Sequence, residues 1–254
     1  MEPSNEQRLR LPRPIIITRV LVTVQILLIL LSTTGQLIRY HTAYDSLLGL
    51  IDQFYLDNEN NIPTYFSGLL LLLSALLLGL LALINRHVGN PFWRHWLWLS
   101  GLFGLLSVDE IASLHEMLIH PMSRYAHVGG LFFFGWVVPG GLFVFGVGLS
   151  LLRFVRSLPA VLRRQLVGAG LTYVAGSLGV EMIGGLYYER AQGQDLTYSL
   201  IVTLEETLEM TGVLLFIHAL LRQLSNRLTG VSLHLRPAAS VAVTRRSPSY
   251  AARV

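Results

Sequence analysis

Long apolar segments alternate with short polar connections along most of this 254-residue chain. A helix needs about 20 mostly apolar residues to cross the hydrocarbon core of a bilayer, and six segments come close to that length. The first follows three arginines but lacks a small-residue cleavage signal, so it is interpreted as a retained span. The pattern predicts an all-α polytopic bundle of six transmembrane helices. The predicted spans cover 15–31, 62–84, 96–119, 131–152, 166–187 and 196–221.

The composition supports a membrane protein and excludes several kinds of chemistry. Hydrophobic residues make up 52% of the chain and charged residues only 13%, against about 25% charged residues in a soluble domain. The chain has no cysteine, which excludes disulfides and thiolate metal ligands. All 19 basic residues are arginine, which excludes a lysine Schiff base and a P-loop lysine.

The arginines predict the orientation of the bundle. Sixteen of them flank one set of span ends, while only Arg39, Arg124 and Arg190 lie in the other three connections. The positive-inside rule therefore puts both termini in the cytoplasm. Three regions are expected: a cytoplasmic N-terminal segment 1–14, a transmembrane domain 15–222 and a disordered basic tail 223–254. Since topology accounts for the basic charge, the expected partners are membrane lipids and not nucleic acid.

The connection between the first two spans is acidic and faces outward in this topology. Apolar residues at helical spacing over 44–55 predict an amphipathic helix lying on the outer leaflet. The alternative is a lid over a site below it. The acidic residues of this connection are Asp45, Asp52, Asp57 and Glu59.

Carboxylates inside the predicted spans are the most specific feature of the sequence. An acidic residue at the bilayer centre costs about 2.5–3.5 kcal/mol even on a lenient insertion scale, and this chain has seven of them. No arginine lies at the same depth to pair with them. Bound cations, protons, water or mutual hydrogen bonds must therefore compensate.

Helical spacing and depth indicate that these acids meet. Asp109, Glu116 and His120 fall on one face of a third helix continued to residue 119. At 1.5 Å per residue, Asp109, Glu181 and Glu205 all lie about 8–13 Å below the outer surface. Three helices thus carry acids at one level, and we expect one shared site.

A divalent metal is the first hypothesis for that site. Iron, manganese and zinc accept mixed carboxylate and imidazole ligands, and helix bundles build such centres from inward side chains. A metal-activated water or oxygen acting on a lipid-soluble substrate would be the matching chemistry. The expected ligands are Asp109, Glu116, His120, Glu181, Glu205 and Glu209. Three further residues are expected to support these ligands or to replace one of them: Glu110, His115 and Glu206.

Other hypotheses use the same acids and stay open at this point. Deep carboxylates that cycle between protonated and ionised forms would suit a proton- or cation-coupled small-molecule transporter. A hydrogen-bonded acid network could equally hold the helices together. A homo-oligomer or a subunit of a larger membrane complex is a further alternative.

Glycines in the fourth and fifth spans favour close helix packing. The alternative at Pro139-Gly140-Gly141 is a break in the helix that forms a hinge.

Four motifs resemble a family of uncharacterised bacterial multi-pass membrane proteins, some of them labelled multidrug transporter. The resemblance covers about residues 100–225 and implies the bacterial inner membrane, without an established mechanism. The motifs are Ser107-Val108-Asp109-Glu110 through Leu114-His115-Glu116, Gly135-Trp136-Val137-Val138-Pro139-Gly140, Gly179-Val180-Glu181-Met182-Ile183-Gly184-Gly185 and Leu204-Glu205-Glu206-Thr207-Leu208-Glu209-Met210.

Overall fold

A computed structural model describes residues 13–42, 44, 46–119, 122, 124 and 129–228, and no strand occurs among them. Six long helical stretches form a bundle. They are α1 (Pro14–His41), α3 (Ile62–His87), α4 (Trp93–Ala112), α6 (Val137–Ser157), the continuous α7 (Ala160–Val174), η3 (Ala175–Val180) and α8 (Glu181–Ala191), and α9 (Leu196–Leu228). Three short elements lie in the connections: α2 (Leu50–Phe54), η1 (Glu116–Leu118) and η2 (Gly130–Phe132).

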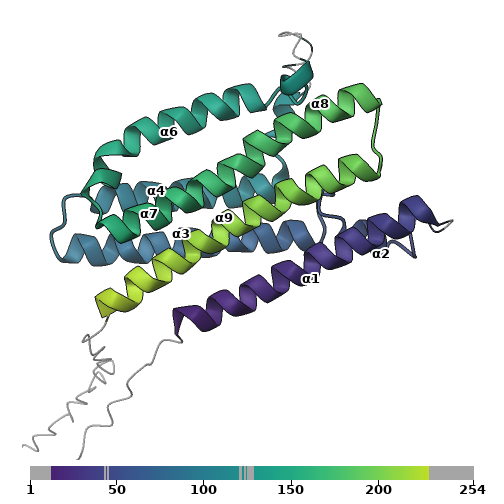
Figure 1. Ribbon diagram of the computed structural model, residues 1–254. Helices are drawn as coiled ribbons and strands as arrows, with labels where there is room; N and C mark the ends of the chain where they lie inside the picture. The colour runs from purple at the N-terminus through teal and green to yellow at the C-terminus, as the bar shows by residue number, and fades with distance from the viewer. Residues whose placement is uncertain are drawn as a thin grey trace, which may run out of the picture.

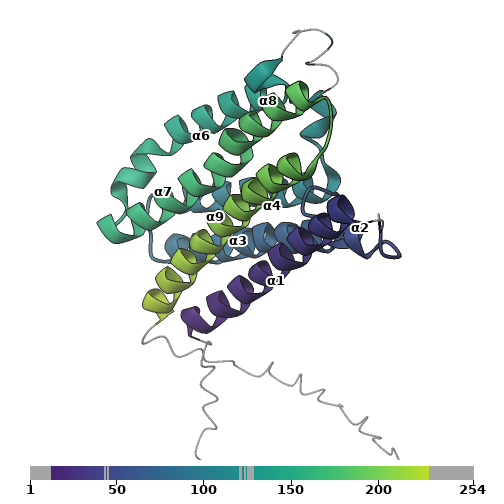
Figure 2. The same cartoon turned by 45° about the vertical axis from the view of Figure 1, so that its right-hand side comes forward.

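The long helices run up and down the bundle in alternate directions (Figure 1). The α2 end, as we name it, contains α2, η1, η2 and the turn from α8 to α9. The α6–α7 end contains the turns from α3 to α4 and from α6 to α7, together with the first residue of α1 and the last of α9. Figure 2 shows α1 on one side of α9, with α7 on the other.

Four stretches are long and apolar enough to cross a membrane: α1, α3, α6 and Ala160–Ala191. The other two bundle helices, α4 and α9, are 20 and 33 residues long and carry five of the acidic residues: Asp109, Glu110, Glu205, Glu206 and Glu209. These helices confirm the prediction of an all-helical protein with membrane-length apolar helices.

The apolar core fills the part of the bundle toward the α6–α7 end. Leu78 and Leu81 of α3 and Ile217 and Leu220 of α9 have no exposed surface. The ring of Phe154 from α6 packs edge-on against Trp96 of α4, with ring centroids 5.0 Å apart. Since lipid is as apolar as these side chains, close packing and not burial from water holds this part together.

Polar side chains join α1 to α9, which the sequence analysis did not anticipate. Gln25 donates a hydrogen bond to the Thr207 carbonyl at 3.1 Å and another to the Thr211 hydroxyl at 3.0 Å. About one turn after the start of α1, the Thr18 hydroxyl lies 2.9 Å from His218 Nδ1 of α9. Interhelical hydrogen bonds of this kind stabilise membrane bundles by about 0.6 kcal/mol each on average.

Several predicted element boundaries were wrong. α4 ends at Ala112 and does not continue to residue 119, because Ser113 adopts a left-handed conformation with φ of 50°. The expected helix over 44–55 is reduced to the five residues of α2. Pro139 does not break α6, since it lies in the first turn, where its missing N–H has no helical partner to lose. α9 continues to Leu228, and the rest of the predicted tail lies outside the described residues.

Glycine permits the close approach of α7 to α9. A Cβ added at Gly212 would lie 2.6 Å from Tyr173 N and 2.9 Å from the carbonyl oxygen of Ala169. These are backbone atoms of α7, so the two helices would have to separate to admit a side chain. A Cβ at Gly104 on α4 would meet nothing within 4 Å.

We expect Gly212→Ala to lower stability by about 1–3 kcal/mol, the usual cost of overpacking a tight contact. Gly104→Ala is the matched control and should be neutral or stabilising by up to about 1 kcal/mol, since alanine favours a helix. Thermal unfolding in detergent, followed by circular dichroism, measures both. Equal melting temperatures for the two variants would contradict the assigned contact.

Candidate functional site

Two carboxyl groups meet in the middle of the bundle. The side chain of Glu181, the first residue of α8, lies beside that of Glu205 in α9, close enough for the two carboxyls to interact directly. Glu181 Oε1 accepts a hydrogen bond from Trp136 Nε1 at 2.8 Å. Two carboxylates side by side in a medium of low dielectric cannot both stay ionised, which favours a proton shared by the pair.

The pair lies at one depth because of where the helices end. Glu181 is ten residues before the end of α8 and Glu205 nine after the start of α9, which puts them about 15 and 14 Å from the α2 end. The two residues are therefore level with each other, and Glu181 lies deeper than the 8 Å expected from the sequence because α8 continues to Ala191.

A π-helical turn and a glycine bring Glu181 to α9. Residues 175–180 form η3, a π-helix directly before Glu181, and such turns are frequent at functional sites. Within it, a Cβ at Gly176 would lie 2.8 Å from the carbonyl oxygen of Glu205 and 3.1 Å from Glu209 N. Only glycine fits this approach without a shift, so the local sequence positions the pair.

Other acids of α4 and α9 lie within electrostatic range of the pair. Glu209 lies beside Tyr173 and interacts with the charges of Glu110 and Glu181. Glu206 interacts with Glu209, Glu110 and Glu181 in the same way. Glu110 lies beside Ser67 of α3. The acids of α4 and α9 thus form one electrostatically connected group with the pair.

Asp109 has a structural partner at the end of α4. Its Oδ1 accepts a hydrogen bond from His115 N at 2.8 Å, and its Oδ2 lies 3.0 Å from His115 Nδ1. The carboxylate therefore holds the turn that follows Ala112. The predicted helical face joining Asp109, Glu116 and His120 was wrong, because α4 ends before it could form.

Glu116 is exposed and lies apart from the pair, in a cavity at the α2 end. The cavity has a volume of about 450 Å³, and Asp57 and Glu59 also line it. Burial and the neighbouring charge of Glu59 raise the pKa of Glu116. Burial, together with the charges of Glu181 and Glu59, raises the pKa of Asp57 to about 6.

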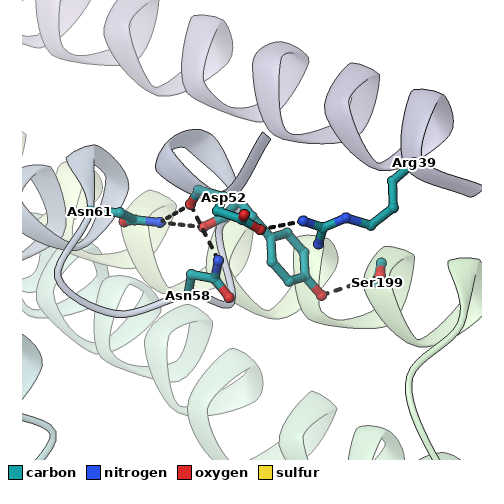
Figure 3. Close-up of polar contacts among 6 residues, drawn as sticks. Arg39, Asp52, Asn58, Asn61 and Ser199 are labelled. Carbon is teal, nitrogen blue, oxygen red and sulfur yellow. Dashed lines mark hydrogen bonds and ion pairs between the residues drawn. The ribbon is translucent and has the colours of Figure 1, made fainter. Parts of the chain in front are cut away.

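The loop that carries Asp57 is fixed to its surroundings by the polar contacts of Figure 3. Asn58 and Asn61 both donate to the carbonyl oxygen of Asp52, whose carboxylate is paired with Arg39 of α1. The buried Tyr55 hydroxyl donates to Ser199 Oγ on α9 at 3.2 Å. The acids of this loop are therefore held in place over the bundle.

The outcome for the predicted site residues is mixed. Glu181 and Glu205 are in contact, while Glu206, Glu209 and Glu110 lie within electrostatic range of them. His120 lies outside the described residues. Within the described part of the chain, no three or more His, Asp or Glu side chains are arranged as a metal site. Metal binding by the predicted ligands stays a prediction.

Sequence reasoning missed the partners of the acids. Trp136, Tyr173 and Tyr198 all lie beside these carboxyls, yet as aromatic residues near helix ends they look like interface anchors. Gln36 of α1 is 1% exposed, and neither polar atom of its amide has a hydrogen-bond partner among the described residues. Its signal in the sequence is a glutamine inside an otherwise apolar helix.

The chain belongs to the family described as Domain of unknown function (DUF8692), which matches residues 17–224. No curated protein and no solved structure matches it. The expectation of an uncharacterised family is therefore confirmed, and the match is longer than the predicted resemblance over about residues 100–225.

The raised pKa of Asp57 predicts a particular pH dependence of stability. The carboxyl has an ordinary pKa of 3.8 in the unfolded chain and about 6 when folded. Between these values the folded state binds more protons, so stability is highest below about pH 4 and falls as the pH rises through about 6. Asp57→Asn should remove this fall and gain up to about 3 kcal/mol over wild type between about pH 4 and pH 7.

Melting temperatures of wild type and Asp57→Asn at both pH values measure the difference. Asp195→Asn is the control, because the hydroxyl of Tyr187 lowers the pKa of Asp195 and its contribution is lost as the pH falls. A stability difference between wild type and Asp57→Asn that is the same at pH 4 and pH 7 would rule out the assigned role of Asp57.

Proposed function

We propose that this member of the DUF8692 family is an integral membrane protein with six transmembrane helices and the α2 end facing out of the cytoplasm. Four stretches satisfy the length and composition of a span, and α4 and α9 run beside them. The alternate directions of the helices and the sixteen-to-three division of arginines support cytoplasmic termini. The proposed location is the bacterial inner membrane.

Proton exchange at the Glu181–Glu205 pair is the proposed elementary step, in a transporter that couples protons to a small-molecule solute. The close approach of these two carboxyls inside the bundle carries this proposal. In a medium of low dielectric, two carboxylates in contact cannot both stay ionised. The pair is thus suited to take up and release a proton.

A series of polar groups supports proton access from the α2 end. Asp57 lines the cavity and interacts electrostatically with Glu181. Tyr198 also lines it and interacts with Asp57, Glu181 and Glu205. Titratable groups therefore extend from the cavity to the pair.

Packed apolar residues such as Leu78, Ile217 and Leu220 close the path from the Glu181–Glu205 pair to the α6–α7 end. A transport cycle would have to open this packed region, and η3 supplies a flexible point beside the pair. Its π-helical hydrogen bonding and its glycines weaken the helix where α7 continues into α8.

Infrared difference spectroscopy of the reconstituted protein tests the proton site directly. We expect a carboxylic-acid carbonyl band that titrates with pH in wild type and is lost in Glu205→Gln. Glu189→Gln is the control, since Glu189 is exposed and accepts a hydrogen bond from Gly130 N. Retention of the full band in both Glu205→Gln and Glu181→Gln would overturn the proposal.

A divalent-metal site is the second candidate function, with metal-assisted chemistry on a lipid-soluble substrate. One observation favours it: Glu205 Oε2 is buried and has no hydrogen-bond partner among the described residues. Iron, manganese or zinc bound there could use Glu181 and Glu209 as further ligands, while Asp109 would first have to leave His115. Glu116 and His120 complete the proposed set.

Metal analysis of the protein purified after metal-replete growth distinguishes the two candidates. The metal proposal predicts about one equivalent in wild type, and a loss of roughly ten- to a hundredfold in affinity for Glu205→Gln. Glu189→Gln should retain the metal. Substoichiometric metal in wild type, with the titrating carboxyl band present, would leave only the proton function.

A further inference from the structure

The cavity at the α2 end has two chemically different walls. Carboxylates of Asp57, Glu59 and Glu116 lie in one part of its lining, from the loop before α3 and from η1. No arginine or histidine occurs in the described lining. At neutral pH this wall is suited to a cation, because its carboxylates are not balanced by a cationic side chain among the lining residues that the structure describes.

Aromatic rings form the other wall. Phe134, Tyr188 and Tyr198 all line the cavity and contact one another in sequence. The ring centroids of Phe134 and Tyr188 are 5.9 Å apart, and those of Tyr188 and Tyr198 are 5.2 Å apart at an angle of 67°. Tilted rings that meet in this way present both faces and edges to the cavity. Ring faces attract cations through the quadrupole of the aromatic system.

Tyr198 is firmly held in the lining of this cavity. Its side chain is only 5% exposed. The backbone N–H of the same residue is bonded to Asp195 Oδ1 at 2.8 Å. The ring is therefore fixed in place before a ligand arrives.

The size of the cavity indicates an organic ligand. A water molecule occupies about 30 Å³ in the liquid, so a volume of about 450 Å³ is far larger than a bare metal ion needs. Clefts that hold small organic molecules measure about 300–1,000 Å³.

We propose that this cavity binds a small organic cation, with its ammonium group between the carboxylates of Asp57 and Glu59 and the rings of Tyr188 and Tyr198. This names the solute class of the proposed transporter and rests on that function for the outward direction of the cavity. Binding itself needs neither transport nor proton exchange. A failure of the proton site and a failure of cation binding therefore give different experimental results.

Choline and its neutral isostere 3,3-dimethylbutanol are suitable probes, because they have the same shape and differ in charge. Saturation-transfer NMR on the full chain in nanodiscs measures both. We expect choline to bind at least about tenfold more tightly than the alcohol, the effect of one cation–π contact of more than about 1 kcal/mol. Raising the ionic strength should weaken choline binding only.

Two variants locate the site. Glu59 is exposed, so Glu59→Gln should not disturb folding, and Tyr188→Leu removes the central ring of the aromatic wall. Each variant should weaken choline binding by about three- to tenfold. Glu189→Gln, an acid of the same end that does not line the cavity, should bind as wild type does. Matching melting temperatures would verify folding.

Three outcomes would overturn the proposal: equal binding of choline and the alcohol, absence of binding by both, or choline binding that Glu59→Gln and Tyr188→Leu leave unchanged. Binding of Mn²⁺ without binding of choline would also overturn it, and would identify the cavity as a metal site. Loss of proton exchange in Glu205→Gln with choline binding intact would separate this site from the pair below it.

Discussion

Carboxyl groups inside a bundle of bilayer-length helices are the constraint on which the rest of this structure depends. An ionised carboxylate in a medium of low dielectric is expensive unless it finds a proton, a donor or a counter-ion. Glu181 has a donor in Trp136. Glu205 lies beside Glu181, and its Oε2 is buried without a hydrogen-bond partner among the described residues.

Meeting this constraint requires close helix packing, and glycine makes it feasible. Gly176 and Gly212 bring the backbone of η3 and α7 against α9, where a Cβ would approach backbone atoms to 2.8 Å or less. The π-helical turn of η3 then directs Glu181 toward Glu205. The same features that stabilise the bundle thus create the contact between two carboxyls on which the proposed chemistry depends.

The bundle is also divided along its length, and this division gives the proposals a direction. Polar and titratable groups lie at the α2 end and down to the level of the Glu181–Glu205 pair, while apolar side chains such as Leu81 and Ile217 fill the other end. The acidic and aromatic cavity lies at the polar end. A solute could therefore reach the acids from one side, which fits either an open state of a transporter or a one-sided binding site.

The sequence by itself determined the helical membrane class, because runs of apolar residues such as 62–84 have only one stable form in lipid, where every backbone polar group must be satisfied within the helix. It also predicted that Glu181 and Glu205 both lie well inside the bundle, since the rise per residue gives an approximate depth once a span is located. Only the tertiary structure decided which acids meet. The end of α4 depends on Asp109 accepting from His115, and the pairing of Glu181 with Glu205 depends on a π-turn and on two glycines packing against a helix far along the chain. Such contacts between distant segments leave no periodic signal in the sequence, so Trp136, Tyr173 and Tyr198 acquire their roles only when the helices are assembled.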